Sequence, residues 1–173
     1  MSLQTVFRLT HRNGFDGLQP FQEPIPTAQS HELLIKIRSV ALNFRDIAIA
    51  TSQYPLPVKD QVIPCGDMSG EVVEVGAHVK GFATGDRVVL PVNPEFLYGD
   101  FKNSDGAFSG GERDGVLREY ISLPAHAVVK LPESSNSFAS WAAMTGTGVT
   151  TWNAFYGNKS LRPGDVVLLE GWS

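Results

Sequence analysis

The chain has 173 residues and a formal net charge of −4 at pH 7, with 42% hydrophobic and 18% charged residues. This balance is that of a globular protein with a core, and not that of a disordered chain. No basic cluster is present to neutralise phosphates, so the net charge argues against a nucleic-acid-binding surface.

The chain has a single cysteine, Cys65, which excludes an internal disulfide framework. The N-terminal residues lack the apolar core of a signal peptide. No apolar run approaches the roughly 20 residues that a membrane-spanning helix needs. We therefore expect a cytoplasmic protein in a reducing compartment, without a membrane partner.

The first third of the chain predicts strands and one short helix. Residues 4–9 alternate moderately and indicate an edge strand, and polar residues 11–26 suit a loop or a short hairpin. Residues 32–42 alternate regularly and predict a strand. Residues 43–50 change to helical spacing, and a proline-rich stretch follows them.

The central stretch, residues 63–89, is rich in valine and punctuated by glycine. It predicts strands at 69–75 and 87–92, which cannot bury their apolar faces alone. The remainder of the chain should therefore wrap around them as a small β-barrel. Residues 91–115 have no period and are too long for an ordinary connection, which is typical of a functional loop.

The last third of the chain predicts two strands, at 116–123 and 127–131. Residues 137–156 are apolar with small side chains, and we expect two helical pieces interrupted near their central glycines. Residues 161–171 predict a turn and then a strand, and the apolar run 166–169 suits a strand buried on both faces.

Several ordered motifs point to a known family. They are A-L-N-F-R-D followed by Q-Y-P, G-D-x-x-G-x-V-x-x-V-G, G-D-R-V, G-V-L-R-E-Y, V-K-L-P and T-G-V-T-T-W-N-A. Over about residues 5–171 the chain resembles medium-chain dehydrogenases and reductases, near the quinone-reductase branch. The resemblance implies a mainly β fold with a few helices. Residues 1–135 would form a GroES-like, partly open β-barrel on the substrate side. Residues 136–173 would supply the linking helix and first strand of an α/β Rossmann domain that is otherwise missing.

The same resemblance assigns site residues. Asn43 would hydrogen-bond cofactor or substrate near the nicotinamide, and Thr150 or Thr151 would face the ring. Gly171 stands where the glycine-rich turn for the pyrophosphate would begin. The resemblance thus implies catalytic roles for Asn43, Asp46 and Tyr54, and cofactor binding by Asn43, Arg45, Thr150, Thr151 and Gly171.

Structural roles are the alternatives at these positions. Asn43 suits the N-cap of the short helix. Arg45 and Asp46 could form a surface ion pair, and Tyr54 could serve packing. Thr150 could hydrogen-bond back to a helix carbonyl.

The resemblance also argues against zinc. The zinc-dependent branch needs a cysteine where this chain has Asn43, a His-Glu pair at Gly66–Asp67, and a second cysteine near Thr147. Zinc requires three nitrogen or sulfur ligands and an open position, which these residues do not supply. We expect no bound metal.

Two functional hypotheses follow. In the first, the chain is the substrate-side domain of a zinc-independent oxidoreductase. It would use NADP(H) or NAD(H) to reduce a small carbonyl, enone or quinone, or act like an alcohol dehydrogenase, and would be inactive alone. In the second, it is a non-catalytic interaction or regulatory module, a homo-oligomer or a partner of a full-length relative.

Overall fold

The structure is a computed structural model and describes residues 2–91, 93, 96 and 108–169. The described part is mainly β with a few helices, as the sequence predicts. In chain order the elements are β1 (Leu3–Leu9), η1 (Phe15–Gly17), β2 (Leu18–Pro24), β3 (Glu32–Ala41), α1 (Phe44–Ala50), β4 (Asp67–Val75), β5 (Arg87–Leu90), β6 (Tyr120–Pro124), η2 (Ala125–Ala127), β7 (Val129–Lys130) and α2 (Phe138–Tyr156).

Strands β1 and β2 form an antiparallel hairpin, in register from Leu3 opposite Pro24 to Leu9 opposite Leu18. Residues 11–26, expected as a loop or a short hairpin, contain η1 and the second strand of this hairpin, whose first strand is β1. Strand β2 is exposed along almost its whole length, so its side chains carry no alternation between core and solvent. The period-2 signal on which a strand prediction depends is absent for that reason.

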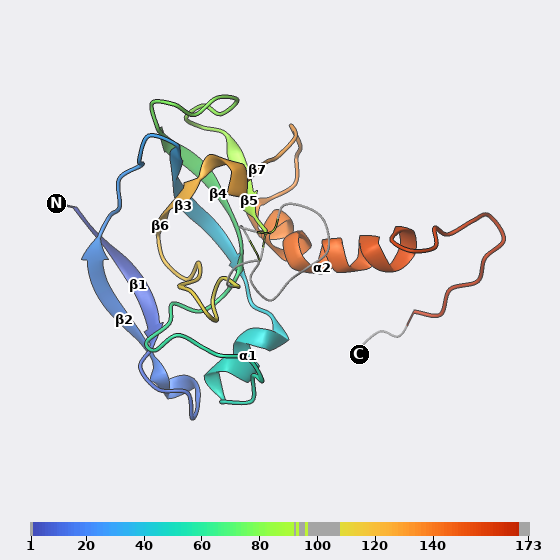
Figure 1. Ribbon diagram of the computed structural model, residues 1–173, viewed down its shortest axis with the longest axis horizontal. Coiled ribbons are helices and arrows are strands. Elements are labelled where there is room, and N and C mark those ends of the chain that lie inside the picture. The colour runs from blue at the N-terminus through green and yellow to red at the C-terminus, as the bar shows by residue number, and fades with distance from the viewer. Residues whose placement is uncertain (1, 92, 94–95, 97–107, 170–173) are drawn as a thin grey trace.

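The second sheet contains five strands in the order β6-β3-β4-β5-β7, and its neighbouring strands are antiparallel. Figure 1 shows the β1–β2 hairpin beside this sheet, with α1 at one end of the molecule. Buried side chains from the central strands fill the core, among them Leu33, Ile35, Met68 and Val72. The backbone N–H of Phe7 donates to the carbonyl of Leu117, which joins the hairpin to the larger unit.

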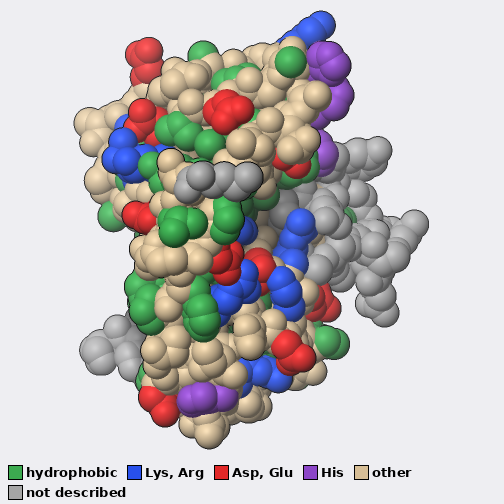
Figure 2. All heavy atoms as spheres, turned by 90° about the vertical axis from the view of Figure 1, so that its left-hand side faces the viewer, with side chains coloured by type: hydrophobic (Ala, Val, Ile, Leu, Met, Phe, Trp, Pro, Cys, Tyr) green, Lys and Arg blue, Asp and Glu red, His purple; other side chains and the backbone are tan. Residues whose placement is uncertain are grey.

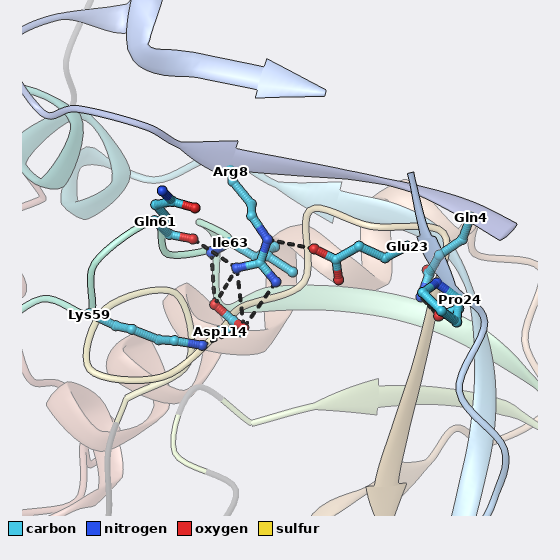
Figure 3. Close-up of polar contacts among 8 residues, drawn as sticks. All are labelled: Gln4, Arg8, Glu23, Pro24, Lys59, Gln61, Ile63 and Asp114. Atoms are coloured by element: carbon cyan, nitrogen blue, oxygen red, sulfur yellow. Dashed lines mark hydrogen bonds and ion pairs between the residues drawn. The ribbon is translucent and has the colours of Figure 1, made fainter. Parts of the chain in front are cut away.

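A polar network also holds the hairpin in place. The guanidinium of Arg8 on β1 donates to Glu23 at 2.6 Å and to the carboxylate of Asp114 at 3.3–3.4 Å. Asp114 also accepts from Lys59 at 2.6 Å and from the backbone N–H of Ile63 at 3.0 Å. Figure 3 shows that Asp114 is the point where these donors converge. Figure 2 shows acidic and basic side chains mixed over one face of the molecule.

Two predicted strands are shorter than expected. The predicted strand at 116–123 begins only at Tyr120, because Val116 and Leu117 donate instead to the carbonyls of Cys65 and Pro64. The predicted strand at 127–131 is reduced to Val129–Lys130, since Ala127 belongs to the turn η2. In both cases backbone groups form tertiary or local hydrogen bonds outside the sheet, so the pairing between strands does not extend over these residues.

The prediction of two helical pieces at 137–156 is wrong, because α2 is one continuous helix of 19 residues. A glycine inside a helix costs only about 1 kcal/mol relative to alanine, and tertiary packing can offset this. Among the described residues, no helix combines the length and apolarity that crossing a membrane requires.

The prediction of a buried strand near residues 166–169 is also wrong. These residues form no strand, and the side chains of Val166 and Leu168 are 97% and 83% exposed. Within the described residues no neighbouring strand pairs with them, and a strand needs such a partner. Figure 1 shows α2 and the segment after it extending away from the sheets. Most of residues 91–115 and the end of 161–171 lie outside the described residues.

Candidate functional site

The candidate site begins where β3 ends and α1 starts. Asn43 occupies the N-cap of α1 with an extended backbone, which confirms the capping role considered for it. Its backbone N–H donates to Oδ2 of Asp46 at 2.8 Å, and the N–H of Asp46 donates to the carbonyl of Asn43 at 2.9 Å. These bonds satisfy groups that every helix leaves open at its first turn.

The side chain of Asn43 reaches a buried carboxylate on another strand. Its Nδ2 atom donates to Oδ2 of Asp67, the first residue of β4, at 2.9 Å. Asp67 is only 4% exposed, and its Oδ1 atom is buried without a hydrogen-bond partner among the described residues. Burial raises the pKa of Asp67, although the hydrogen bond from Asn43, the charge of Arg45 and a hydrogen bond from the backbone of Gly146 oppose that rise.

Helix α2 supplies the opposite wall of the site. A Cβ atom placed on Gly146 would lie 2.6 Å from Oδ2 of Asp67, so the helix approaches the carboxylate only because this residue is glycine. Two contacts fix the start of the helix. The hydroxyl of Ser69 donates to the carbonyl of Phe138 at 2.5 Å, and the guanidinium of Arg87 lies over the Phe138 ring at 4.5 Å.

These elements enclose a cleft of about 550 Å³. Its lining contains four of the residues that the sequence assigns to the site, and four more that it does not. The eight lining residues are Asn43, Arg45, Gly66, Asp67, Gly146, Thr147, Thr150 and Thr151.

The threonines of this cleft share one hydrogen-bond pattern. The hydroxyls of Thr147, Thr150 and Thr151 donate to the backbone carbonyls four residues earlier in α2. The alternative considered for Thr150, a bond back to a helix carbonyl, is therefore confirmed. Because each hydroxyl hydrogen is used inside the helix, the Oγ1 atoms offer lone pairs to the cleft.

Asp46 and Tyr54 do not line this cleft. Asp46 is half-buried beside a neighbouring apolar pocket of about 370 Å³. Burial raises its pKa, while the hydrogen bond from Asn43 and the charge of Arg45 lower it. The ring of Tyr54 packs against the apolar cluster around Ile49. The Arg45 guanidinium donates to the carbonyl of Ser109, and Gly171 lies outside the described residues.

Sequence reasoning did not assign Gly66, Asp67, Gly146 and Thr147 to substrate or cofactor binding. Thr147 could have been found, because residues three and four apart share one helix face and Thr150 and Thr151 had already been named. Asp67 stands in the G-D pair that opens a predicted strand, but a sequence does not reveal what a strand residue faces. In the sequence, Gly146 indicates only a break in a helix and not a close contact with another segment.

Comparison with known proteins places this architecture in a family. Residues 29–133 match the family model described as alcohol dehydrogenase GroES-like domain. The chain belongs to this family. The GroES-like domain accounts for β3 through β7, and therefore for the Asn43 and Asp67 side of the cleft.

Relatives and solved structures agree with this assignment. The chain is 38% identical over 165 residues to a zinc-type alcohol dehydrogenase-like protein of Schizosaccharomyces pombe, covering 92% of this chain and 47% of that protein. It is 42% identical over 147 residues to a chloroplast envelope quinone oxidoreductase homolog of Arabidopsis thaliana, covering 84% and 39%. The structure of an NAD-dependent alcohol dehydrogenase superposes with a TM-score of 0.79 at 27% identity, covering 93% and 49%. The chain thus spans half or less of the length of these matches.

The residues of the cleft differ from the ligand sets that protein zinc sites commonly use. Asn43, Gly66–Asp67 and Thr147, which stand where the resemblance expects zinc ligands, do converge on this cleft. They offer an amide, one carboxylate and a hydroxyl, whereas protein zinc sites are built from thiolate, imidazole and carboxylate ligands in varying combinations. Among the described residues, no three His, Cys, Asp or Glu side chains gather in a way that could hold a metal ion.

Proposed function

We propose that the chain is the substrate-side part of a zinc-independent, NAD(P)H-dependent oxidoreductase. Its substrate would be a small carbonyl, enone or quinone, or the corresponding alcohol. The observation that carries this proposal is the cleft itself, in which residues from α1, β4 and α2 face one another. The names of the relatives, alcohol dehydrogenase and quinone oxidoreductase, agree with this chemistry.

The residues of the cleft suit the nicotinamide end of such a cofactor. Thr150 and Thr151 present polar oxygens from the α2 wall, while Asn43 and Arg45 do so from the other side. The cofactor would supply the hydride, so the work of the protein is to position both reactants and exclude water. In this proposal Asp46 acts indirectly, by fixing the backbone of Asn43, and Tyr54 shapes the neighbouring apolar wall.

We further propose that these 173 residues do not transfer hydride by themselves. Residues 1–135 would be the GroES-like domain and residues 136–173 the beginning of a nucleotide-binding domain. The chain covers 47% and 39% of the lengths of the two relatives described above. This supports the proposal, because the remaining part of each relative has no counterpart in these 173 residues. We place the protein in the cytoplasm, without nucleic-acid or membrane partners.

One observation favours the second candidate function, an interaction module. Helix α2 exposes Met144, Val149 and Trp152 by 51%, 69% and 68%. These side chains border an apolar groove of about 670 Å³, which α2 shares with β5 and β7. In this alternative the groove would receive a second copy of the chain or a full-length relative.

The deciding experiment is kinetic. The complete gene product is assayed for oxidation of NADPH and NADH with a quinone, an enone and a ketone, beside its Asn43→Ser variant. Serine preserves the helix cap, so a fall in kcat/KM of about tenfold or more, an effect of about 1.4 kcal/mol or larger on the transition state, would support a role at the reacting end. Asp60→Asn, which changes an exposed carboxylate elsewhere, is the control. Equal rates in wild type and Asn43→Ser would contradict the site assignment.

The 173-residue chain is tested separately for cofactor binding. We expect its Kd for NADPH to be weaker than about 10 μM, or about 7 kcal/mol of binding free energy. Tighter binding would contradict the proposal that this chain alone is inactive. Stable association with the complete gene product in size-exclusion chromatography would favour the interaction module.

A further inference from the structure

Two exposed histidines meet beside the start of β3. His31 immediately precedes this strand, whereas the cleft around Asn43 lies beyond the other end of the same strand. His78 lies in the turn that follows β4. The centroids of the two imidazole rings are 5.0 Å apart, and the ring planes are tilted by 51°. Figure 2 shows histidine side chains gathered at one edge of the molecule.

Backbone hydrogen bonds hold together the two segments that carry these rings. The N–H of His78 donates to the carbonyl of Ser30 at 2.8 Å, and the N–H of Gly76 donates to the carbonyl of Glu32 at 2.9 Å. Ser30 and Glu32 are the chain neighbours of His31, so these bonds act on both sides of it. The backbone under both rings is therefore positioned before any ligand binds, which lowers the entropy cost of binding.

The separation of the two rings suits one shared metal ion. A metal ion binds an imidazole nitrogen at about 2.0–2.1 Å, which places the ring centre roughly 3.2 Å from the ion. Two rings held at about the tetrahedral angle would therefore have centroids about 5 Å apart. The rings of His31 and His78 have this separation, and imidazole is a ligand that suits zinc, copper and nickel.

We propose that His31 and His78 form a two-histidine site for a divalent transition-metal ion. Copper(II) should bind most tightly, because it stands highest in the Irving–Williams order. The nearby carboxylate of Glu32 does not complete the site, since it accepts from the N–H of Gln29 at 3.1 Å and from the hydroxyl of Ser122 at 2.8 Å. Water would fill the remaining positions, in agreement with the lack of a three-ligand group among the described residues.

The test is a titration of the 173-residue chain with copper(II) chloride. Metal binding needs neutral imidazole, so the titration is made at pH 7.5. Calorimetry gives the Kd and the stoichiometry, and electron paramagnetic resonance counts the nitrogen atoms bound to copper. We expect one copper ion per chain with two imidazole nitrogens.

Variants of the pair distinguish one shared site from separate histidines. His31→Ala and His78→Ala should each weaken binding about 10-fold or more, because the second ligand of a chelate binds at a high effective concentration. The double variant should bind about as weakly as either single variant, since one imidazole cannot chelate. His126→Ala is the matched control, because it alters another exposed histidine, and it should retain the wild-type Kd.

Gly76→Ala tests the positioning of the pair and keeps both imidazoles. Its Cβ would overlap the carbonyl oxygen of Gln29, so the two segments must move apart. We expect weaker copper binding with the same number of histidines. The variants of the two exposed histidines keep the inference testable if Gly76→Ala fails to fold.

Three results would overturn the inference. They are a wild-type Kd in either single variant of the pair, a spectrum with one bound nitrogen, or losses of binding that simply add up over all the histidines removed, His126 included. The last result would mean that copper binds separate surface histidines. Because the pair does not line the cleft, none of these results depends on the proposed function.

Discussion

The Nδ2 atom of Asn43 donates a hydrogen bond of 2.9 Å to Oδ2 of Asp67, and this contact joins the N-cap of α1 to the buried first residue of β4. The two residues are 24 positions apart, and Gly146 of α2 covers the same carboxylate. Three segments therefore meet at one polar contact inside a mainly apolar domain. The packing of the site depends on these few atoms, and the proposed function would depend on the same ones.

We expect Gly146→Ala to destabilise the protein by about 1–3 kcal/mol, the usual effect of overpacking. The new Cβ would lie 2.6 Å from Oδ2 and 3.1 Å from Oδ1 of Asp67, so the helix or the carboxylate must move. Urea unfolding monitored by circular dichroism measures the change in free energy.

Gly148→Ala is the matched control on the same helix. Its Cβ would meet the Cβ of Met144 at 3.7 Å, an ordinary contact. Alanine is the better helix former, so we expect a gain of about 0.5–1 kcal/mol. Equal effects of the two substitutions would show that contact with Asp67 does not constrain Gly146.

We expect Asp114→Asn to destabilise the protein by about 1–3 kcal/mol at pH 7, since charged hydrogen bonds contribute about that much. Burial alone would raise the pKa of Asp114, but the hydrogen bonds from Lys59 and the Ile63 N–H, with the charge of Arg8, lower it overall. Because the pKa is lower in the folded state, the ionised carboxylate stabilises the protein above the unfolded-state pKa of about 3.9. This stabilisation is lost as the pH falls through the folded-state pKa. The difference between wild type and Asp114→Asn should therefore shrink as the pH falls from about 5 to about 2. A difference that stays constant over this range would contradict the role assigned to the Asp114 charge.

We expect the Cys65 thiol of the native protein to be unreactive towards Ellman's reagent at pH 8. The side chain is 1% exposed, and burial raises the pKa of the thiol to about 12, so little thiolate is present or accessible. In 8 M urea the same thiol should react completely within the usual time of the assay. Rapid reaction of the folded protein would show that the segment before Asp67 opens readily.

We expect the purified protein to contain well below one zinc ion per chain. The amide, carboxylate and hydroxyl that Asn43, Asp67 and Thr147 bring to the cleft bind zinc poorly without thiolate or imidazole ligands. Elemental analysis after dialysis against zinc and then against metal-free buffer measures this. Stoichiometric zinc, lost in Asp67→Asn, would contradict our interpretation of the cleft.

The family and most of the strands could be predicted from the sequence. Residues 32–42 alternate in sequence and form β3, although the structure buries Leu33, Leu34 and Ile35 in succession, so the start of this strand is covered on both faces. The ordered motifs indicated the family, and the match over residues 29–133 confirms it. They also named Asn43, Arg45, Thr150 and Thr151, which the structure brings to one cleft.

Tertiary structure alone decided what these residues face. Helix α2 continues through Gly146, and the absence of a side chain there lets the helix lie against Asp67, a residue almost eighty positions earlier in the chain. That residues 165–169 form no strand depends on whether a neighbouring strand is present to pair with them. Local propensity is a property of a segment, whereas the partners of a buried carboxylate, and the neighbour that a strand needs, belong to the surroundings that the fold creates.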